Sequence, residues 1–134
     1  MRINRVQPDG THPTPGYHHV TIVEAGRTAY LAGQCPLDAS GAVVGAGDLM
    51  AQVDQVAVNA LAVLSAAGAT PGDVVRSVIY VASDDTAELA AVWDRLNAGP
   101  IAEAFTTAST LLGVTALGFT GQRVELDLTA SLPT

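Results

Sequence analysis

Apolar residues recur at helical spacing in two parts of the chain. Between Leu49 and Gly68 they follow a period of three to four residues, directly after Asp48, which can cap a helix. A shorter stripe follows Asp85, which has Glu88 three residues later in the spacing of a capping box. The pattern predicts one helix that Gly68 ends and a second that ends within residues 97–100. Their apolar positions are Leu49, Val53, Val56, Ala57, Ala60, Leu61, Leu64, Leu89, Val92, Trp93 and Leu96.

Segments rich in β-branched residues indicate strands. Residues 19–24 and 28–34 are separated by Ala25-Gly26-Arg27, which predicts a hairpin. Residues 73–82 are largely apolar on both faces, as in a central strand, and residues 106–114 are rich in Thr, Leu and Val. The last strand alternates strictly: Val124, Leu126, Leu128 and Ala130 lie between Arg123, Glu125, Asp127 and Thr129.

The order of these elements predicts an α+β fold, β-β-α-β-α-β-β, in one domain over residues 1–134. The prolines and glycines in residues 8–16 and 36–47 predict that these two segments are loops. Connections of helix length predict a mixed sheet with both helices packed on one face. The other face is then open to solvent or covered by another copy of the chain, and the 49% hydrophobic content favours an interface.

The charge of the chain argues against a nucleic-acid partner. The 134 residues carry 6 Lys+Arg and 13 Asp+Glu, a net charge of −7, and all six cations are scattered arginines. The most apolar stretch is too short to span a bilayer, and we expect no membrane partner. The single cysteine, Cys35, has no disulfide partner and the N-terminal residues do not read as a signal peptide, so we expect a cytoplasmic protein.

Several segments, in their order and spacing, resemble a known family. They are Pro15-Gly16-Tyr17, LAGQCPLD at 31–38 followed by 41–44, the long segment 51–83, and VELDLTA at 124–130. Together they resemble the Rid family, the YjgF-type reactive intermediate deaminases once described as L-PSP endoribonucleases. The resemblance covers nearly the whole chain.

The resemblance implies a chorismate-mutase-like homotrimer in which small-molecule ligands sit in clefts between subunits. It also implies hydrolysis of short-lived imines and enamines, such as 2-aminoacrylate, to 2-keto acids and ammonia. That reaction needs a group that holds the substrate carboxylate, an anchored water, and an acid or base near the nitrogen, but no cofactor.

The arginine that holds the carboxylate in this family has no direct counterpart here. It sits on the penultimate strand, and the matching stretch, 107–110, has Ser109 at its position. An alternative register puts Phe105 there, 20 residues before Glu125, whereas Ser109 lies 16 before it and nearly keeps the family spacing. We therefore expect slow hydrolysis of carboxylate-bearing imines and a gain of activity in Ser109→Arg. Thr110 and Leu111 would line the same cleft, and a second departure is Trp93, where many members have asparagine.

Three residues match functional positions of the family, each with a simpler structural alternative. Glu125 matches an acidic residue that positions the attacking water, or it is a solvated carboxylate on a polar strand face. Tyr17 matches a tyrosine that reaches into the cleft, or it packs against the domain edge. Gly33 either makes a main-chain contact to the ligand or only shapes a turn.

The remaining polar residues are weaker candidates. His18 and His19 are adjacent and point to opposite faces of an extended segment, so we expect no metal site there, with His12 in a flexible lead-in. Cys35 lies beside the cleft position and is best explained as an inert thiol. Arg123 could pair with Glu125 or Asp127, replace the missing arginine, or remain solvated.

Three functions fit these features. The first is a deaminase of altered substrate scope, and the second is a trimer that binds a metabolite without turnover. The third is a dedicated biosynthetic enzyme acting on a larger, less polar intermediate. A ribonuclease is disfavoured, because a chain of charge −7 repels phosphate.

Overall fold

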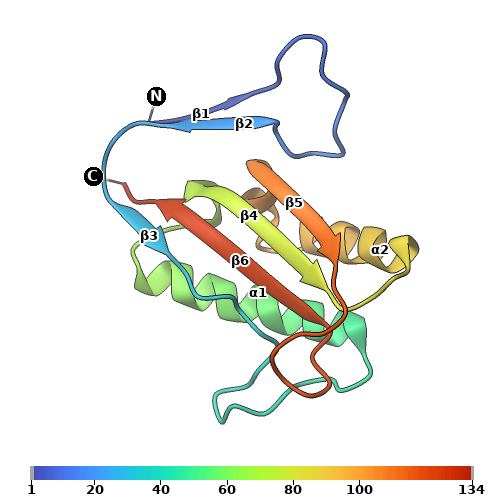
Figure 1. The fold of residues 1–134 in the computed structure, drawn as a ribbon. Helices are drawn as coiled ribbons and strands as arrows, with labels where there is room; N and C mark the ends of the chain where they lie inside the picture. Colours follow the sequence, from blue (N-terminus) through green and yellow to red (C-terminus); the bar gives the residue numbers. More distant parts are fainter. Residues whose placement is uncertain (1, 134) are drawn as a thin grey trace.

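A four-stranded mixed sheet forms the centre of the protein (Figure 1). The computed structural model describes residues 2–133, so Met1 and Thr134, the ends of the predicted domain, lie outside it. The strand order is β3-β6-β4-β5, with β4 antiparallel to β6 and parallel to β5. The strands are β3 (Thr28–Tyr30), β4 (Val74–Val81), β5 (Ala108–Gly113) and β6 (Val124–Ser131).

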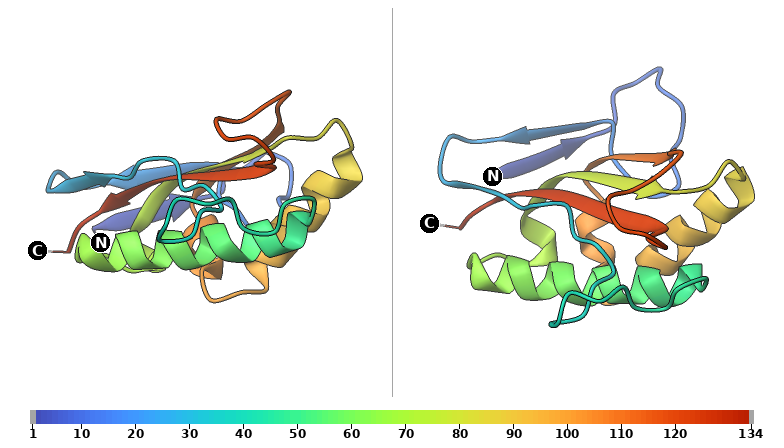
Figure 2. Two further views of the ribbon diagram at one scale, coloured as in Figure 1. Left: turned by 90° about the horizontal axis from the view of Figure 1, so that it is seen from below. Right: turned by 60° about the horizontal axis from the view of Figure 1, so that its bottom comes forward.

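Both helices pack on one face of this sheet, as predicted (Figure 2). They are α1 (Leu49–Ala66) and α2 (Thr86–Asn97), and two short 3-10 turns, η1 (Pro71–Asp73) and η2 (Ala102–Phe105), precede β4 and β5. The alternate residues of β6 that face the helices, Val124, Leu126, Leu128 and Ala130, are at most 1% exposed. The central position of β4 and the two-faced character of β6 are confirmed.

Helix α1 is long and apolar enough to meet the length and composition criteria for a membrane span. Core helices of soluble proteins meet the same criteria, and seven residues of α1 are buried in the domain. The features of α1 are therefore those of a core helix, in a small α+β domain.

The predicted hairpin between residues 19–24 and 28–34 is wrong. β2 (Val20–Val23) pairs instead with β1 (Ile3–Val6), a strand that the sequence did not reveal, and β3 pairs with β6. The pairing with β6 continues at Leu132 N–H, which donates to Arg27 O at 2.9 Å. The pairing of β3 with β6 provides hydrogen-bond partners for the backbone along one edge of β6. That edge would lack partners if residues 28–34 paired with residues 19–24 instead.

The predicted caps are only partly formed. Asp48 and Asp85 cap α1 and α2, accepting from Ala51 N–H at 3.1 Å and from Ala87 N–H at 2.9 Å. Glu88 does not complete a capping box, because its carboxylate binds the Ser83 hydroxyl and the Arg123 guanidinium. An ion pair to the loop before β6 takes the place of the reciprocal backbone bond.

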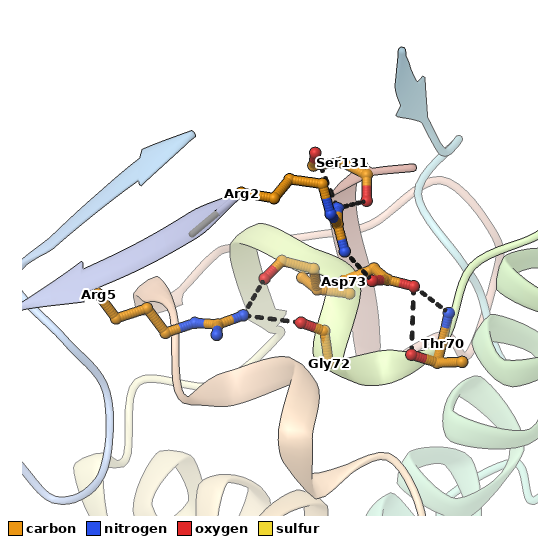
Figure 3. A network of polar contacts seen from close by, with 7 residues as sticks. Arg2, Arg5, Thr70, Gly72, Asp73 and Ser131 are labelled. Atoms are coloured by element: carbon orange, nitrogen blue, oxygen red, sulfur yellow. Dashed lines mark hydrogen bonds and ion pairs between the residues drawn. The ribbon is translucent and has the colours of Figure 1, made fainter. Parts of the chain in front are cut away.

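Two arginines of β1 and its N-terminal flank attach the β1–β2 ribbon to the main domain (Figure 3). Arg2 forms a 2.6 Å ion pair with Asp73 and also donates to Ser131 O and Oγ, at 2.5 and 3.0 Å. Arg5 donates to the carbonyl oxygens of Gly72 and Val74 at 2.9 and 3.1 Å. Asp73 also accepts from Thr70 N–H, so one buried carboxylate links three segments of the chain.

Replacing Asp73 by Ala should lower the free energy of unfolding by about 2 to 4 kcal/mol, because it leaves a partly buried guanidinium without its carboxylate. The exposed pair Arg95–Asp54, with side chains 50% and 54% exposed, offers a matched control, and Asp54→Ala should cost about 1 kcal/mol or less. Urea denaturation of both variants measures the difference. Equal costs would contradict a structural role for the Arg2–Asp73 pair.

The contact between Arg2 and Asp73 should also make the stability of the fold depend on pH under acidic conditions. Burial opposes ionisation of Asp73, but hydrogen bonds from Thr70 and Arg2 outweigh it and lower the pKa of this carboxyl. A lowered pKa in the folded state stabilises the fold above the ordinary pKa of Asp, and this stabilisation is lost as the pH falls through the lowered value. Wild type should therefore lose stability more steeply below about pH 4 than Asp73→Ala does.

Candidate active site

The helix-free face of the sheet carries most of the polar side chains of the central strands. The register places Arg76, Val78 and Tyr80 of β4 on this face, opposite Thr129, Asp127 and Glu125 of β6. On the other side of β4, the paired residues of β5 are Ala108, Thr110 and Leu112. No helix covers this face in Figure 2, and Tyr30 at its β3 edge is 83% exposed.

Glu125 lies at the end of this face where the chain segment after β3 runs alongside β6. Gln34 forms a bridge with Leu126, which brings the neighbouring Gly33 against the Glu125 carboxylate. A Cβ at position 33 would lie 2.2 Å from Glu125 Oε2, so only glycine leaves room for this arrangement. The predicted residues Gly33 and Glu125 are thus in direct contact.

The two carboxylate oxygens of Glu125 differ in their hydrogen bonds. Oε1 accepts from the Cys35 thiol and from Gln122 Nε2, both at 3.2 Å. The described residues provide no donor to Oε2, which faces Gly33. Two donors therefore hold the carboxylate by one oxygen and leave the other able to accept from water.

Polar side chains on α1 hold the loops that form this arrangement. Gln52 is fully buried and binds Gly121 O at 2.9 Å and Arg123 N–H at 2.7 Å. About two turns on, Asn59 donates to Cys35 O at 3.0 Å and Leu37 O at 2.8 Å. Gln52 and Asn59 thereby position the loops on either side of Glu125.

A shallow hollow of about 530 Å³ opens beside Gly33 and Cys35. Its rim includes Phe119, which is 46% exposed on the loop before β6. The backbone N–H of Phe119 donates to Gln122, the residue that also binds Glu125. Gln122 therefore links Phe119, at the rim of the hollow, to the carboxylate of Glu125 through hydrogen bonds.

Cys35 is a protonated donor at neutral pH. Burial, the hydrogen bond to Glu125 and the charge of that carboxylate raise the pKa of the thiol from 9.0 to about 11. A thiol with such a pKa is a weak nucleophile, in keeping with the predicted inert role. Its contact with Glu125 makes it a positioning residue.

Alkylation of Cys35 by iodoacetamide at pH 8 should therefore be about 100-fold slower than that of a cysteine of ordinary pKa. In Glu125→Gln the thiol loses the neighbouring charge, so the reaction should accelerate. Mass spectrometry of the single adduct measures both rates, with the urea-unfolded chain as the control for full reactivity. A folded wild type that reacts as fast as the unfolded chain would contradict this assignment.

Tyr17 lies elsewhere, at the β5 edge. Its ring packs edge-on against Trp93 at 6.0 Å, and both line a cavity of about 260 Å³ together with Ser109 and Leu111. Trp93 is buried, as predicted, and its indole N–H donates to Pro15 O. Within one chain, Tyr17 and Gly33 line different hollows.

Ser109 and Glu125 lie on opposite faces of the sheet. The Ser109 hydroxyl is 2.5 Å from that of Ser77 on the helix side, and Phe105, the alternative match, is fully buried. A longer side chain at 109 would therefore lie on the helix side of the sheet, where Ser109 lines the cavity beside Tyr17. The open-face positions of β5 are Ala108 and Thr110. The expected gain of activity in Ser109→Arg stays a prediction.

The remaining candidates are separated from Glu125. Arg123 pairs with Glu88 at 2.9 Å, and neither predicted pairing, with Glu125 or with Asp127, is formed. His18 and His19 bind the carbonyl oxygens of Thr106 and His12. Among residues 2–133 no three His, Cys, Asp or Glu side chains are grouped as metal ligands.

Comparison with known proteins gives consistent matches over nearly the whole chain. The family model described as Endoribonuclease L-PSP matches residues 10–132. Protein DfrA of Myxococcus xanthus is 34% identical over 116 residues, covering 85% of this chain and 83% of that protein.

Solved structures agree with these matches. YyfB of Yersinia pestis, a Rid-family protein of unknown function, is 38% identical, with a TM-score of 0.87 over 98% of this chain and all of that one. Rv2704 of Mycobacterium tuberculosis, of the YjgF/YER057c/UK114 family, is 25% identical, with a TM-score of 0.64 over 97% of this chain and 99% of that one.

Proposed function

This chain belongs to the endoribonuclease L-PSP family, which includes the Rid proteins, and we propose that it hydrolyses small imines to carbonyl compounds and ammonia at Glu125. The observation that carries the proposal is the carboxylate of Glu125, held by Oε1 while Oε2 faces Gly33 without a donor. A fixed carboxylate with one unused oxygen suits the orientation of a water.

The proposed reaction needs only proton transfers around one water. Glu125 Oε2 accepts a proton as the water oxygen attacks the imine carbon, and returns it to the substrate nitrogen to give a neutral carbinolamine. The carbinolamine hydroxyl then passes its proton through the same carboxylate to the nitrogen as the C–N bond breaks, so the nitrogen leaves as ammonia and the carbon becomes a carbonyl. Water and imine are thereby converted to ketone and ammonia with no redox change.

We also propose that the working form is a cytoplasmic homotrimer whose clefts lie between protomers. Two observations support the oligomer. The helix-free sheet face and the β1–β2 ribbon expose large apolar side chains, including Tyr30 at 83% and Ile22 at 56%. The two hollows with predicted site residues, around Gly33 and around Tyr17, are separate in one chain, as expected if a cleft takes one from each neighbour.

The experiment generates an imino acid with an amino-acid oxidase and follows its disappearance by absorbance. We expect the purified protein to accelerate hydrolysis in proportion to its concentration. In size-exclusion chromatography with light scattering, its molar mass should be that of three chains. A heat-denatured sample controls for added protein. A stable monomer, or an imine lifetime unchanged by micromolar protein, would contradict the proposal.

A further inference from the structure

Residues of α2, of β5 and of the segment before β2 line a cavity of about 260 Å³ on the helix side of the sheet. Tyr17 and Trp93 form two of its walls, with their rings at 87° to each other and the ring centroids 6.0 Å apart. Ser109 and Leu111 line it from β5. Two perpendicular aromatic rings make an apolar corner, in which a third ring can pack face-on to one and edge-on to the other.

Two polar groups of this cavity are already satisfied within the chain. The Ser109 hydroxyl accepts from Ser77 Oγ at 2.5 Å and donates to a backbone carbonyl at 3.0 Å, which uses its one hydrogen. The indole N–H of Trp93 donates to Pro15 O at 3.3 Å. Among the described residues, the Tyr17 hydroxyl has no hydrogen-bond partner, so it remains free to donate to a ligand.

The charge around the cavity disfavours an anion. Within the described part of the chain, none of the lining residues is an arginine, a lysine or a histidine. Asp94 lines the cavity at an exposed position, and the neighbouring Arg95 is paired with Asp54 instead. A carboxylate that entered would lose its water without meeting a cation and would also face the negative charge of Asp94.

The volume of the cavity limits the size of its occupant. An apolar cavity of about 150 Å³ in another protein holds a benzene ring, so about 260 Å³ accommodates one ring with a substituent of two or three atoms. The aromatic corner and the lack of a free charged donor favour an uncharged group of that size over a polar one.

We infer that this cavity binds the uncharged, apolar body of the substrate, and that the preferred substrate is an imine of about one ring that carries no carboxylate. The inference rests on the proposed function, in which a cleft joins this cavity to Glu125 of a neighbouring protomer. Tyr17 and Trp93 select the ring, and Asp94 disfavours an acid. Imino acids should then be hydrolysed more slowly than imines with a methyl group in place of the carboxylate.

Binding of acetophenone and of benzoylformate tests this preference without turnover, because the two differ only by a methyl group in place of the carboxylate. In calorimetry at physiological salt, wild type should bind acetophenone at least about 10-fold more tightly. Trp93 is the single tryptophan of the chain, so in protein labelled with fluorotryptophan its fluorine resonance should shift along the same titration curve. Equal affinities, tighter binding of benzoylformate, no binding of acetophenone, or an unshifted resonance would overturn the inference.

Ala90→Leu and Ala91→Leu form a matched pair of variants on α2. Both alanines are exposed, but of the two it is Ala90 that lines the cavity. Leucine is a good helix former, so both variants should keep the wild-type urea midpoint. Ala90→Leu should weaken acetophenone binding at least about 10-fold because the larger side chain occupies the cavity, whereas Ala91→Leu should bind like wild type. Equal affinities of the two variants would overturn the assignment of the site.

Hydrolysis of two matched imines separates this inference from the proposed function. An amine oxidase acting on α-methylbenzylamine and an amino-acid oxidase acting on phenylglycine supply the imines of acetophenone and benzoylformate at equal rates. Wild type should accelerate hydrolysis of the first at least about 10-fold more than that of the second. Equal or faster hydrolysis of the acid imine would overturn the inference and leave the proposed function standing. Selective binding of acetophenone with hydrolysis of neither imine would refute the proposed function and leave the binding site standing.

Discussion

Glu125→Gln should lower imine hydrolysis by about 100-fold or more, since an amide in place of Oε2 cannot take the proton of the attacking water. The fold should be little affected, within about 1 kcal/mol, because the Gln side chain keeps an oxygen that can accept from Cys35 and Gln122. Initial rates at saturating imine and a urea unfolding curve on the same sample separate the two effects.

Asp127→Asn is the matched control for this variant. Asp127 lies two residues further along β6, on the same open face and with similar partial burial, but it is not held against Gly33. It should retain at least about half of the wild-type rate, since removing a charge at that distance changes only a screened interaction. Equal losses in both variants would mean that the overall charge of the face, and not the position of Glu125, determines the rate.

Gly33→Ala should also reduce turnover, by about 10- to 100-fold, through steric displacement of the same carboxylate. The added Cβ would lie 2.2 Å from Oε2 and 2.8 Å from Cδ of Glu125, so the carboxylate must rotate away from the position that its two donors fix. A small displacement of a catalytic group is enough for a loss of this size. The rate constant, compared with the unfolding free energy, checks this result.

Gly26→Ala provides the control for the added methyl group. A Cβ at Gly26 meets nothing within 4 Å, and the backbone there does not need a positive φ. This variant should therefore match wild type in rate and stability. If Gly33→Ala also kept the wild-type rate, the contact between Gly33 and Glu125 would have no catalytic importance.

The two helices and the central and last strands could be predicted from the sequence because each carries a local period. The apolar stripe of α1 and the strict alternation of β6 are properties of consecutive residues, and both are found in the structure. The partners of β2 and β3 were not predictable in this way. β3 pairs with a strand about 100 residues away, and β1 is a four-residue strand that Arg2 and Arg5 attach to the main domain.

The sheet faces that Ser109 and Glu125 occupy were not predictable from the sequence, for a related reason. Neighbouring residues of a strand point to opposite faces, so an error of one residue in register moves a side chain through the sheet. The spacing between Ser109 and Glu125 includes the irregular loop from Val114 to Arg123, and this spacing cannot determine which face each residue occupies. Ala108 and Thr110 share the face of Glu125, and Arg76 joins them from β4.

Gly33 and Glu125 were predicted as site residues, and Cys35 was predicted to lie beside the cleft. Gln122 and Phe119 were not predicted as neighbours of Glu125. One signal was present in the sequence, since polar Gln52 and Asn59 lie among the apolar residues of this helix. The structure gives the reason, because these side chains bind the backbone of the two loops beside Glu125. Which loops they would bind depended on tertiary contacts.

The central claim, that Glu125 turns over an imine, is tested most directly by competition with semicarbazide. An oxidase supplies the imino acid, semicarbazide traps whatever is not hydrolysed, and the loss of semicarbazone is compared with the amount of protein added. Repeated turnover predicts that each protomer removes many equivalents of imine from the trap and that Glu125→Gln removes few or none. If wild type lowers the semicarbazone yield by no more than one equivalent per protomer, the protein binds the intermediate without hydrolysing it, and the claim is wrong.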